Sequence, residues 1–173
     1  MTPKEIETFL ASAYSMADYE LLFQRAADNQ KIFNTLWEMV KKGPDKKTWR
    51  FLWIMDHATE KQNDFILPIL DEVYMMVLKT NNESVVRHTM KLILRCPVNE
   101  EYAGELLDRC SSWMNNPKSK ISSQVLGMEF FYRTCQLYPE MAPELITLID
   151  DLLERSPSAG FKSKLKKIRN EFK

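Results

Sequence analysis

The chain is short of glycine, of any excess of charge and of long apolar runs. Only 4 of its 173 residues are glycine and 8 are proline, so it has little material for tight hairpins. Basic and acidic residues balance at 24 each, which weighs against a protein that binds the phosphate backbone of nucleic acid. No apolar run approaches the roughly 20 residues of a membrane-spanning helix, and Met1 leads into polar residues rather than a signal segment. We therefore expect a cytoplasmic protein without a membrane partner.

The residues that usually carry catalysis or bind metals are also scarce. Three cysteines, an odd number, lack CxxC spacing and fall in apolar helical patterns, which predicts reduced, buried thiols: Cys96, Cys110 and Cys135. Neither His57 nor His88 lies in a motif of nucleophilic catalysis. His57 and Glu60 share a helix face, but a helical metal site needs a second such pair, and the nearby sequence offers none. The sequence thus predicts no catalytic site, no metal and no cofactor.

What the chain has in abundance is apolar residues at helical spacing, bounded by helix-capping residues. Thr2, Pro3 and Glu5 form a capping signal before the first apolar stripe. The clearest later helices are predicted at 48–60, 65–79, 85–96, 100–114, 120–137, 144–154 and 159–172. About ten helices joined by short loops must pack as about five antiparallel pairs. We expect one all-α domain, residues 1–173.

The helices also repeat. A shift of about 37 residues places Arg50 on Arg87 and Asp71 on Asp108. Helix pairs with a period near 40 residues are typical of HEAT and armadillo arrays, in which neighbouring pairs bury each other's apolar faces.

One repeat carries a more specific pattern. Ile66-Leu67-Pro68-Ile69-Leu70, then Asn81-Asn82, then Val86-Arg87, resembles a HEAT repeat with its proline, its turn and its Val-Arg pair. The resemblance covers residues 46–173 and implies an α-α superhelix, with residues 1–43 as N-terminal capping helices. The next copy departs from the pattern, because Lys118 and Gln124 stand where the family places its turn Asp and helix Arg.

Residues 16–23 and 49–56 are similar to a family of short bacterial helical-repeat proteins, some of which carry an adenylosuccinate-lyase label. That enzyme superfamily uses a Ser-Ser loop followed by Met-Pro-x-Lys-x-Asn. Here Ser122-Ser123 is followed by Gln124-Val125, which does not match. The resemblance therefore implies no lyase chemistry.

One helix carries two tryptophans and a carboxylate. Trp49, Trp53 and Asp56 follow one another by about one turn each. This arrangement resembles the base-holding cleft of HEAT-like DNA glycosylases of the alkylation-repair type. The alternative is that both indoles are core residues and that Asp56 bonds to a helix end or a basic residue.

A second candidate site is acidic. In HEAT-like stacks the second helix of each pair lines the concave face, and five carboxylates are expected at matching positions of those helices: Asp71, Glu72, Asp108, Asp150 and Asp151. If they point inward, they form a strip that favours a basic protein or peptide; if they point outward, they are only solvated. We therefore predict a non-enzymatic interaction module that binds a partner protein along its concave face. The alternative is a nucleic-acid-binding protein that uses Trp49, Trp53 and Asp56.

Overall fold

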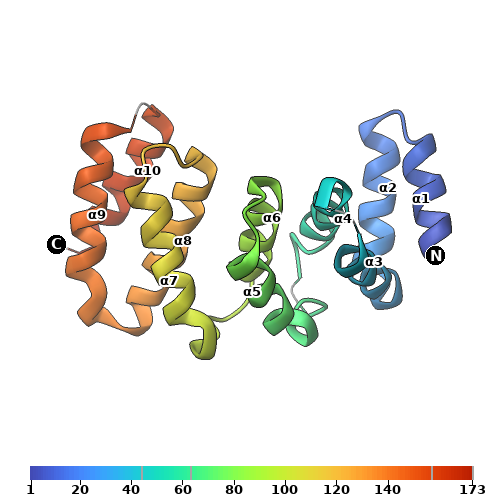
Figure 1. Ribbon diagram of the computed structural model, residues 1–173, viewed down its shortest axis with the longest axis horizontal. Coiled ribbons are helices and arrows are strands. Elements are labelled where there is room, and N and C mark those ends of the chain that lie inside the picture. Colours follow the sequence, from blue (N-terminus) through green and yellow to red (C-terminus); the bar gives the residue numbers. More distant parts are fainter. Residues whose placement is uncertain (44, 63, 157, 173) are drawn as a thin grey trace. The chain divides into compact units, whose positions relative to one another are not determined.

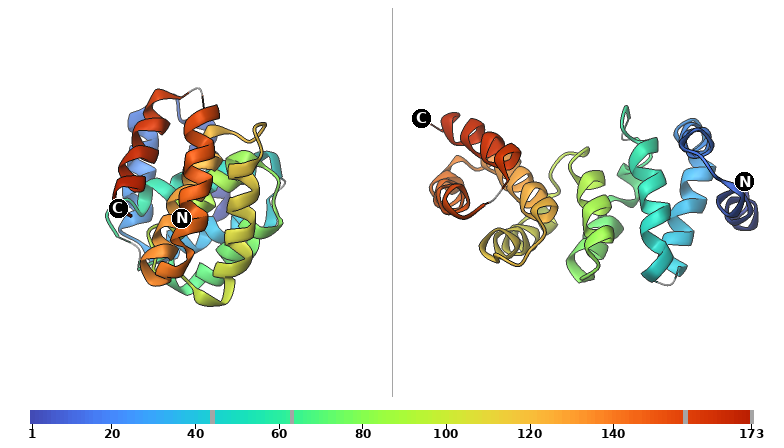
Figure 2. Two further views of the ribbon diagram at one scale, coloured as in Figure 1. Left: turned by 90° about the vertical axis from the view of Figure 1, so that its left-hand side faces the viewer. Right: turned by 90° about the horizontal axis from the view of Figure 1, so that it is seen from above.

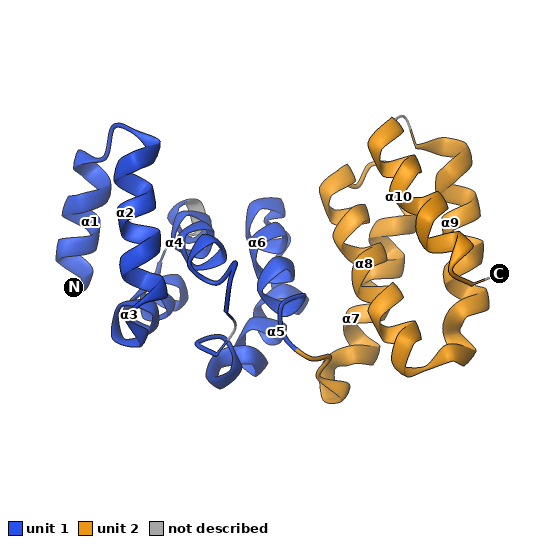
Figure 3. Cartoon of the chain, turned by 180° about the vertical axis from the view of Figure 1, so that it is seen from behind, with its two compact units in different colours: residues 1–96 blue, residues 97–173 orange. Residues whose placement is uncertain are grey.

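The structure is a computed structural model that describes residues 1–43, 45–62, 64–156 and 158–172. Within these residues it contains ten α-helices, two short 3₁₀ helices and no strand. Its contacts divide the chain into two compact units, unit 1 with residues 1–96 and unit 2 with residues 97–173 (Figure 3). The predicted all-α class is confirmed, and the prediction of one domain stays a prediction.

Unit 1 contains six α-helices, and Figure 1 labels them in chain order. They are α1 (Pro3–Ser12), α2 (Met16–Ala27), α3 (Gln30–Lys42), α4 (Asp45–Ala58), α5 (Leu70–Lys79) and α6 (Glu83–Ile93). The helix predicted from residue 65 instead begins as a 3₁₀ turn, η1 (Leu67–Ile69). Pro68 lies in the first turn of η1, where its missing N–H costs nothing.

Polar side chains fix where several of these helices begin. Thr2 and Glu5 exchange hydrogen bonds in a capping box, as the sequence predicted, and Ser15 forms a second box with Asp18. Asn82 accepts hydrogen bonds from the first backbone N–H groups of α6. Short loops join most of these helices, so that neighbours along the chain fold back on one another.

The core of unit 1 lies between two rows of helices. α2 packs on α4 and α4 packs on α6, which makes one row, whereas α3 packs against α2 and α4, and α5 against α6. Fully buried side chains such as Phe33, Leu52, Met55 and Tyr74 fill the space between them. The pair α3/α4 spans residue 43, the predicted end of the N-terminal capping helices.

Unit 2 contains α7 (Glu100–Asn115), α8 (Ile121–Leu137), a 3₁₀ turn η2 (Pro139–Met141), α9 (Ala142–Arg155) and α10 (Ala159–Asn170). Two further views show α7/α8 and α9/α10 as antiparallel neighbours (Figure 2). α7 and α8 approach closely because Gly127 has no side chain: a Cβ at that position would lie 3.3 Å from the Cβ of Cys110. Cys96, Cys110 and Cys135 are all free and buried, as predicted.

Candidate functional site

The helix that carries Trp49 and Trp53, α4, packs part of its aromatic side chains against α2. The rings of Trp53 and Tyr19 are 5.1 Å apart, and those of Trp53 and Phe23 are 5.0 Å apart. One turn later, His57 stacks on Phe23 at 4.6 Å. Trp49 and Trp53 remain only half-buried. The contacts with α2 thus hold the Trp53 indole in place while leaving part of it open to solvent.

Asp56 lies on α4 but faces a different neighbour. Its side chain is 1% exposed and accepts hydrogen bonds from two residues of α6 and from one in the turn after it: Lys91 Nζ at 2.9 Å, His88 Nδ1 at 3.0 Å and Arg95 Nη2 at 2.6 Å. Burial alone would raise the pKa of the Asp56 carboxyl, but these hydrogen bonds outweigh burial and hold the pKa well below its usual range. The carboxylate is therefore ionised, and the His88 Nδ1 must carry the hydrogen that it donates.

This ion cluster joins α4 to the α6 segment and its C-terminal turn. Arg95 also donates to the hydroxyl of Thr59 at 3.3 Å, so that one guanidinium contacts two residues at the end of α4. Lys91 and Arg95 are both partly exposed, so the cluster extends from the buried carboxylate to the protein surface.

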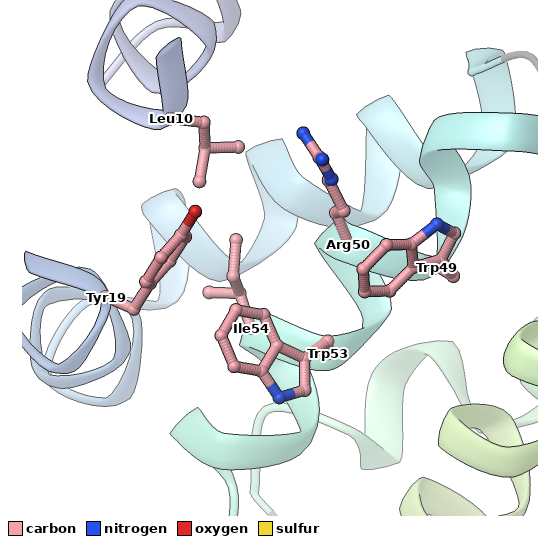
Figure 4. Close-up of a pocket in the computed structure, with 6 residues that line it drawn as sticks. All are labelled: Leu10, Tyr19, Trp49, Arg50, Trp53 and Ile54. Atoms are coloured by element: carbon pink, nitrogen blue, oxygen red, sulfur yellow. The ribbon is translucent and has the colours of Figure 1, made fainter. Parts of the chain in front are cut away.

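Two hollows meet at the tryptophans. The first, about 260 Å³, is lined by Leu10, Tyr19, Trp49, Arg50, Trp53 and Ile54. Figure 4 shows Leu10 and Tyr19 opposite Trp49 and Arg50, with Trp53 and Ile54 between them. The second, about 340 Å³, is lined by Trp49, Trp53, His57, Ser84, Arg87, His88 and Lys91. We call the residues that line these two hollows the tryptophan surface.

The two hollows differ in chemistry. Apolar side chains dominate the first, and cations and histidines dominate the second. The Arg50 guanidinium lies 5.6 Å from the centre of the Trp49 ring, in cation–π range. Arg87 is exposed, and no ion pair joins it to a carboxylate among the described residues. The tryptophan surface therefore places an apolar depression next to a positively charged one.

The structure separates the residues proposed for the nucleic-acid alternative. Trp49 and Trp53 line both hollows, whereas Asp56 lines neither and is enclosed by its cations. Asp56 bonds to basic residues, as one of the two interpretations from the sequence expects, but Trp49 and Trp53 are half-buried and are not the core residues of that interpretation.

The acidic residues lie on other helices than expected. Asp71 and Glu72 lie on α5, Asp108 on α7, and Asp150 and Asp151 on α9, and each of these is the first helix of its pair. The expected placement on second helices is wrong, because packing joins α5 to α6, α7 to α8 and α9 to α10. Whether these residues bind a partner stays a prediction.

Glu72, Asp150 and Asp151 each pair with a cation of their own unit. Glu72 accepts from Trp37 Nε1 at 2.8 Å and pairs with a lysine of α3, Lys41, at 3.0 Å. Asp150 pairs with Arg169, and Asp151 with Arg155 at 2.8 Å. These pairs reduce the charge available to a partner.

The cations around Asp56 were missed in the sequence, although a signal was present. His88, Lys91 and Arg95 follow one another at helical spacing and so share one face. Their common target became visible only when α4 and α6 were known to be neighbours.

None of the described helices is long and apolar enough to span a bilayer. No curated protein and no solved structure matches the chain significantly. A family model described as a HEAT repeat domain matches residues 6–172. The match begins well before residue 46, so it also covers the helices predicted to form the N-terminal cap. Together with the paired helices, this match shows that the chain belongs to the HEAT repeat family.

Proposed function

We propose that this chain is a non-enzymatic interaction module that binds a segment of a partner protein on the tryptophan surface. The observation that carries the proposal is the position of Trp49 and Trp53, half-exposed between two hollows. Tryptophan and arginine are the residues most enriched at binding hot spots. Helical-repeat proteins commonly bind along a surface built by one row of helices, and α2, α4 and α6 form such a row.

The rigidity of these aromatic side chains supports this role. Trp53 is fixed by Tyr19, Phe23 and His57 before any ligand arrives. A side chain that is already ordered loses little conformational entropy on binding, so more of the contact energy appears as affinity.

The side chains that contact the two indoles favour a protein partner over nucleic acid. Base stacking needs an open aromatic face. Arg50 lies over the Trp49 ring, and three rings already contact Trp53. The enclosed Asp56 also leaves neither hollow with the carboxylate that the glycosylase resemblance implies.

The experiment compares proteins captured by the full chain, by Trp49→Ala and by Trp113→Ala. Trp113 is a matched control, because it is also half-buried and also lies under an arginine, but it belongs to unit 2. Captured proteins are quantified by mass spectrometry after nuclease treatment of the lysate, and circular dichroism checks that each variant is folded. We expect Trp49→Ala to lose a set of proteins that Trp113→Ala keeps. The same set with both variants would refute the proposal.

A further inference from the structure

Resting on the proposed function, we infer that the partner segment is an acidic peptide that inserts one bulky apolar side chain beside its carboxylates. The inference follows from the different chemistry of the two hollows and from the two tryptophans that they share. It names the chemistry of the partner, which the proposed function leaves open.

The first hollow fits a single large side chain. Its volume of about 260 Å³ lies below the roughly 300–1,000 Å³ of pockets that take drug-sized ligands. It lies above the roughly 150 Å³ that accommodates a benzene molecule. Leu10, Ile54 and the aromatic rings supply apolar contact on several sides. A leucine or an aromatic residue of a peptide has the size and character to fill it.

The charges beside this hollow determine which peptide residues are favoured next to the anchor, the apolar side chain that fills the hollow. Arg50 lies at the first hollow, and Arg87 and Lys91 line the second. No ion pair joins Arg50 or Arg87 to a described carboxylate, and Lys91 shares its single carboxylate with Arg95. Guanidinium groups bind carboxylates through two parallel hydrogen bonds, so the arginines favour aspartate or glutamate over a neutral residue.

The two indoles shared by the hollows determine how far the carboxylates of the peptide lie from its apolar anchor. Since Trp49 and Trp53 line both hollows, a ligand anchored in one lies against the wall of the other. A peptide can therefore reach both with carboxylates only a residue or two from its anchor. The Glu60 carboxylate, which would repel such a segment, is held by His57 at 2.8 Å.

The test selects short random peptides displayed on phage against the immobilised full chain. Enriched sequences are made as fluorescent peptides, and their affinities are measured by polarisation for the wild type, Arg87→Glu and Lys166→Glu. Lys166 is a matched exposed cation in unit 2. A thymidine oligonucleotide serves as a second anionic probe.

We expect enriched peptides with an excess of acidic residues around one aromatic or large aliphatic residue. Arg87→Glu should weaken their binding about tenfold or more, and Lys166→Glu less than about twofold. Added salt should weaken binding as well. Tighter binding of the oligonucleotide than of any peptide would overturn the inference.

The outcomes separate this inference from the proposed function. Neutral or basic peptides whose binding is lost in Trp49→Ala would refute the acidic partner and leave the proposed binding surface standing. Peptides that bind Trp49→Ala and Arg87→Glu as well as the wild type would refute both.

Discussion

Asp56 should be a main determinant of the stability of unit 1. In Asp56→Asn the side chain keeps its size but loses its charge, and its amide nitrogen cannot accept a hydrogen bond. Lys91, Arg95 and His88 would then face a neutral group in a site where Asp56 is 1% exposed. The perturbation thus removes the attraction across the α4–α6 contact and leaves its apolar packing in place.

The expected loss of unfolding free energy in Asp56→Asn depends on how exposed the cations around Asp56 are. Breaking a buried ion pair by removing one member costs about 3–5 kcal/mol. Lys91 and Arg95 have side chains 40% and 22% exposed, so both can recover hydration when Asp56 is neutralised. We therefore expect the free energy of unfolding to fall by about 3 kcal/mol, the lower end of that range.

Urea denaturation followed by circular dichroism measures this change, and Asp151→Asn is the control. Asp151 also pairs with an arginine at 2.8 Å, but its side chain is 56% exposed and its partner lies on the same helix. Such exposed pairs contribute less than about 1 kcal/mol. Equal losses in the two variants would show that burial and the cross-helix contacts add nothing at Asp56.

The pH dependence gives an independent check. The pKa of Asp56 is depressed in the folded chain, so its contribution is present above the unfolded pKa, about 3.9, and is lost as pH falls toward the folded value. The stability difference between wild type and Asp56→Asn should be constant near neutral pH and should shrink below about pH 4. A difference that stays constant down to about pH 2.5, with both proteins still folding reversibly, would refute the assigned role.

Other variants test the packing of the two units. Trp53→Ala should lower the free energy of unfolding by about 2–3 kcal/mol, because the half-buried indole contacts two rings of α2, and an unchanged urea midpoint would argue that it does not pack there. Gly127→Ala should destabilise the chain by about 1–3 kcal/mol, since its Cβ would lie 3.3 Å from Cys110. Gly104 also lies within a helix, but a Cβ added there would have no atom within 4 Å, so Gly104→Ala should stabilise the chain by about 0.5–1 kcal/mol. If both glycine variants shifted the melting temperature in the same direction, the close α7–α8 contact at Gly127 would be contradicted. Burial raises the pKa of Cys135 to about 11, so native protein should react with a thiol reagent at neutral pH far more slowly than unfolded protein, and fast labelling would contradict its burial.

Local patterns were enough to predict the helices. Capping residues and apolar spacing act within a few residues, so the helix ends at Asn115 and Leu137 lie within a residue of prediction or on it. The HEAT resemblance was likewise carried by local features. The sequence of residues 1–43 has no recognisable repeat pattern, yet α3 pairs with α4 as a regular member of the array.

Pairing between helices was harder to predict. Any helix in a regular series can pair with the one before it or the one after it, and apolar stripes alone do not decide between them. The expectation that the acidic residues lie on second helices fails because it pairs each helix with the wrong neighbour along the chain. The partners of Asp56 are more than 30 residues away in sequence, and only the packing of α4 on α6 brings them together.

The stabilising cluster and the proposed binding surface share the same two helices but use different faces of α4. Asp56 faces inward to the cations of α6, while Trp49 and Trp53 line the hollows. By holding Lys91, Asp56 also fixes the rotation of α6, and Arg87 lies one turn before Lys91 on that helix. A fixed rotation keeps Arg87 beside the tryptophans, so on the proposed function Asp56 would support binding without contacting the partner. Loss of Asp56 should therefore weaken both stability and binding, whereas loss of Arg87, which is exposed and forms no described ion pair, should weaken binding alone.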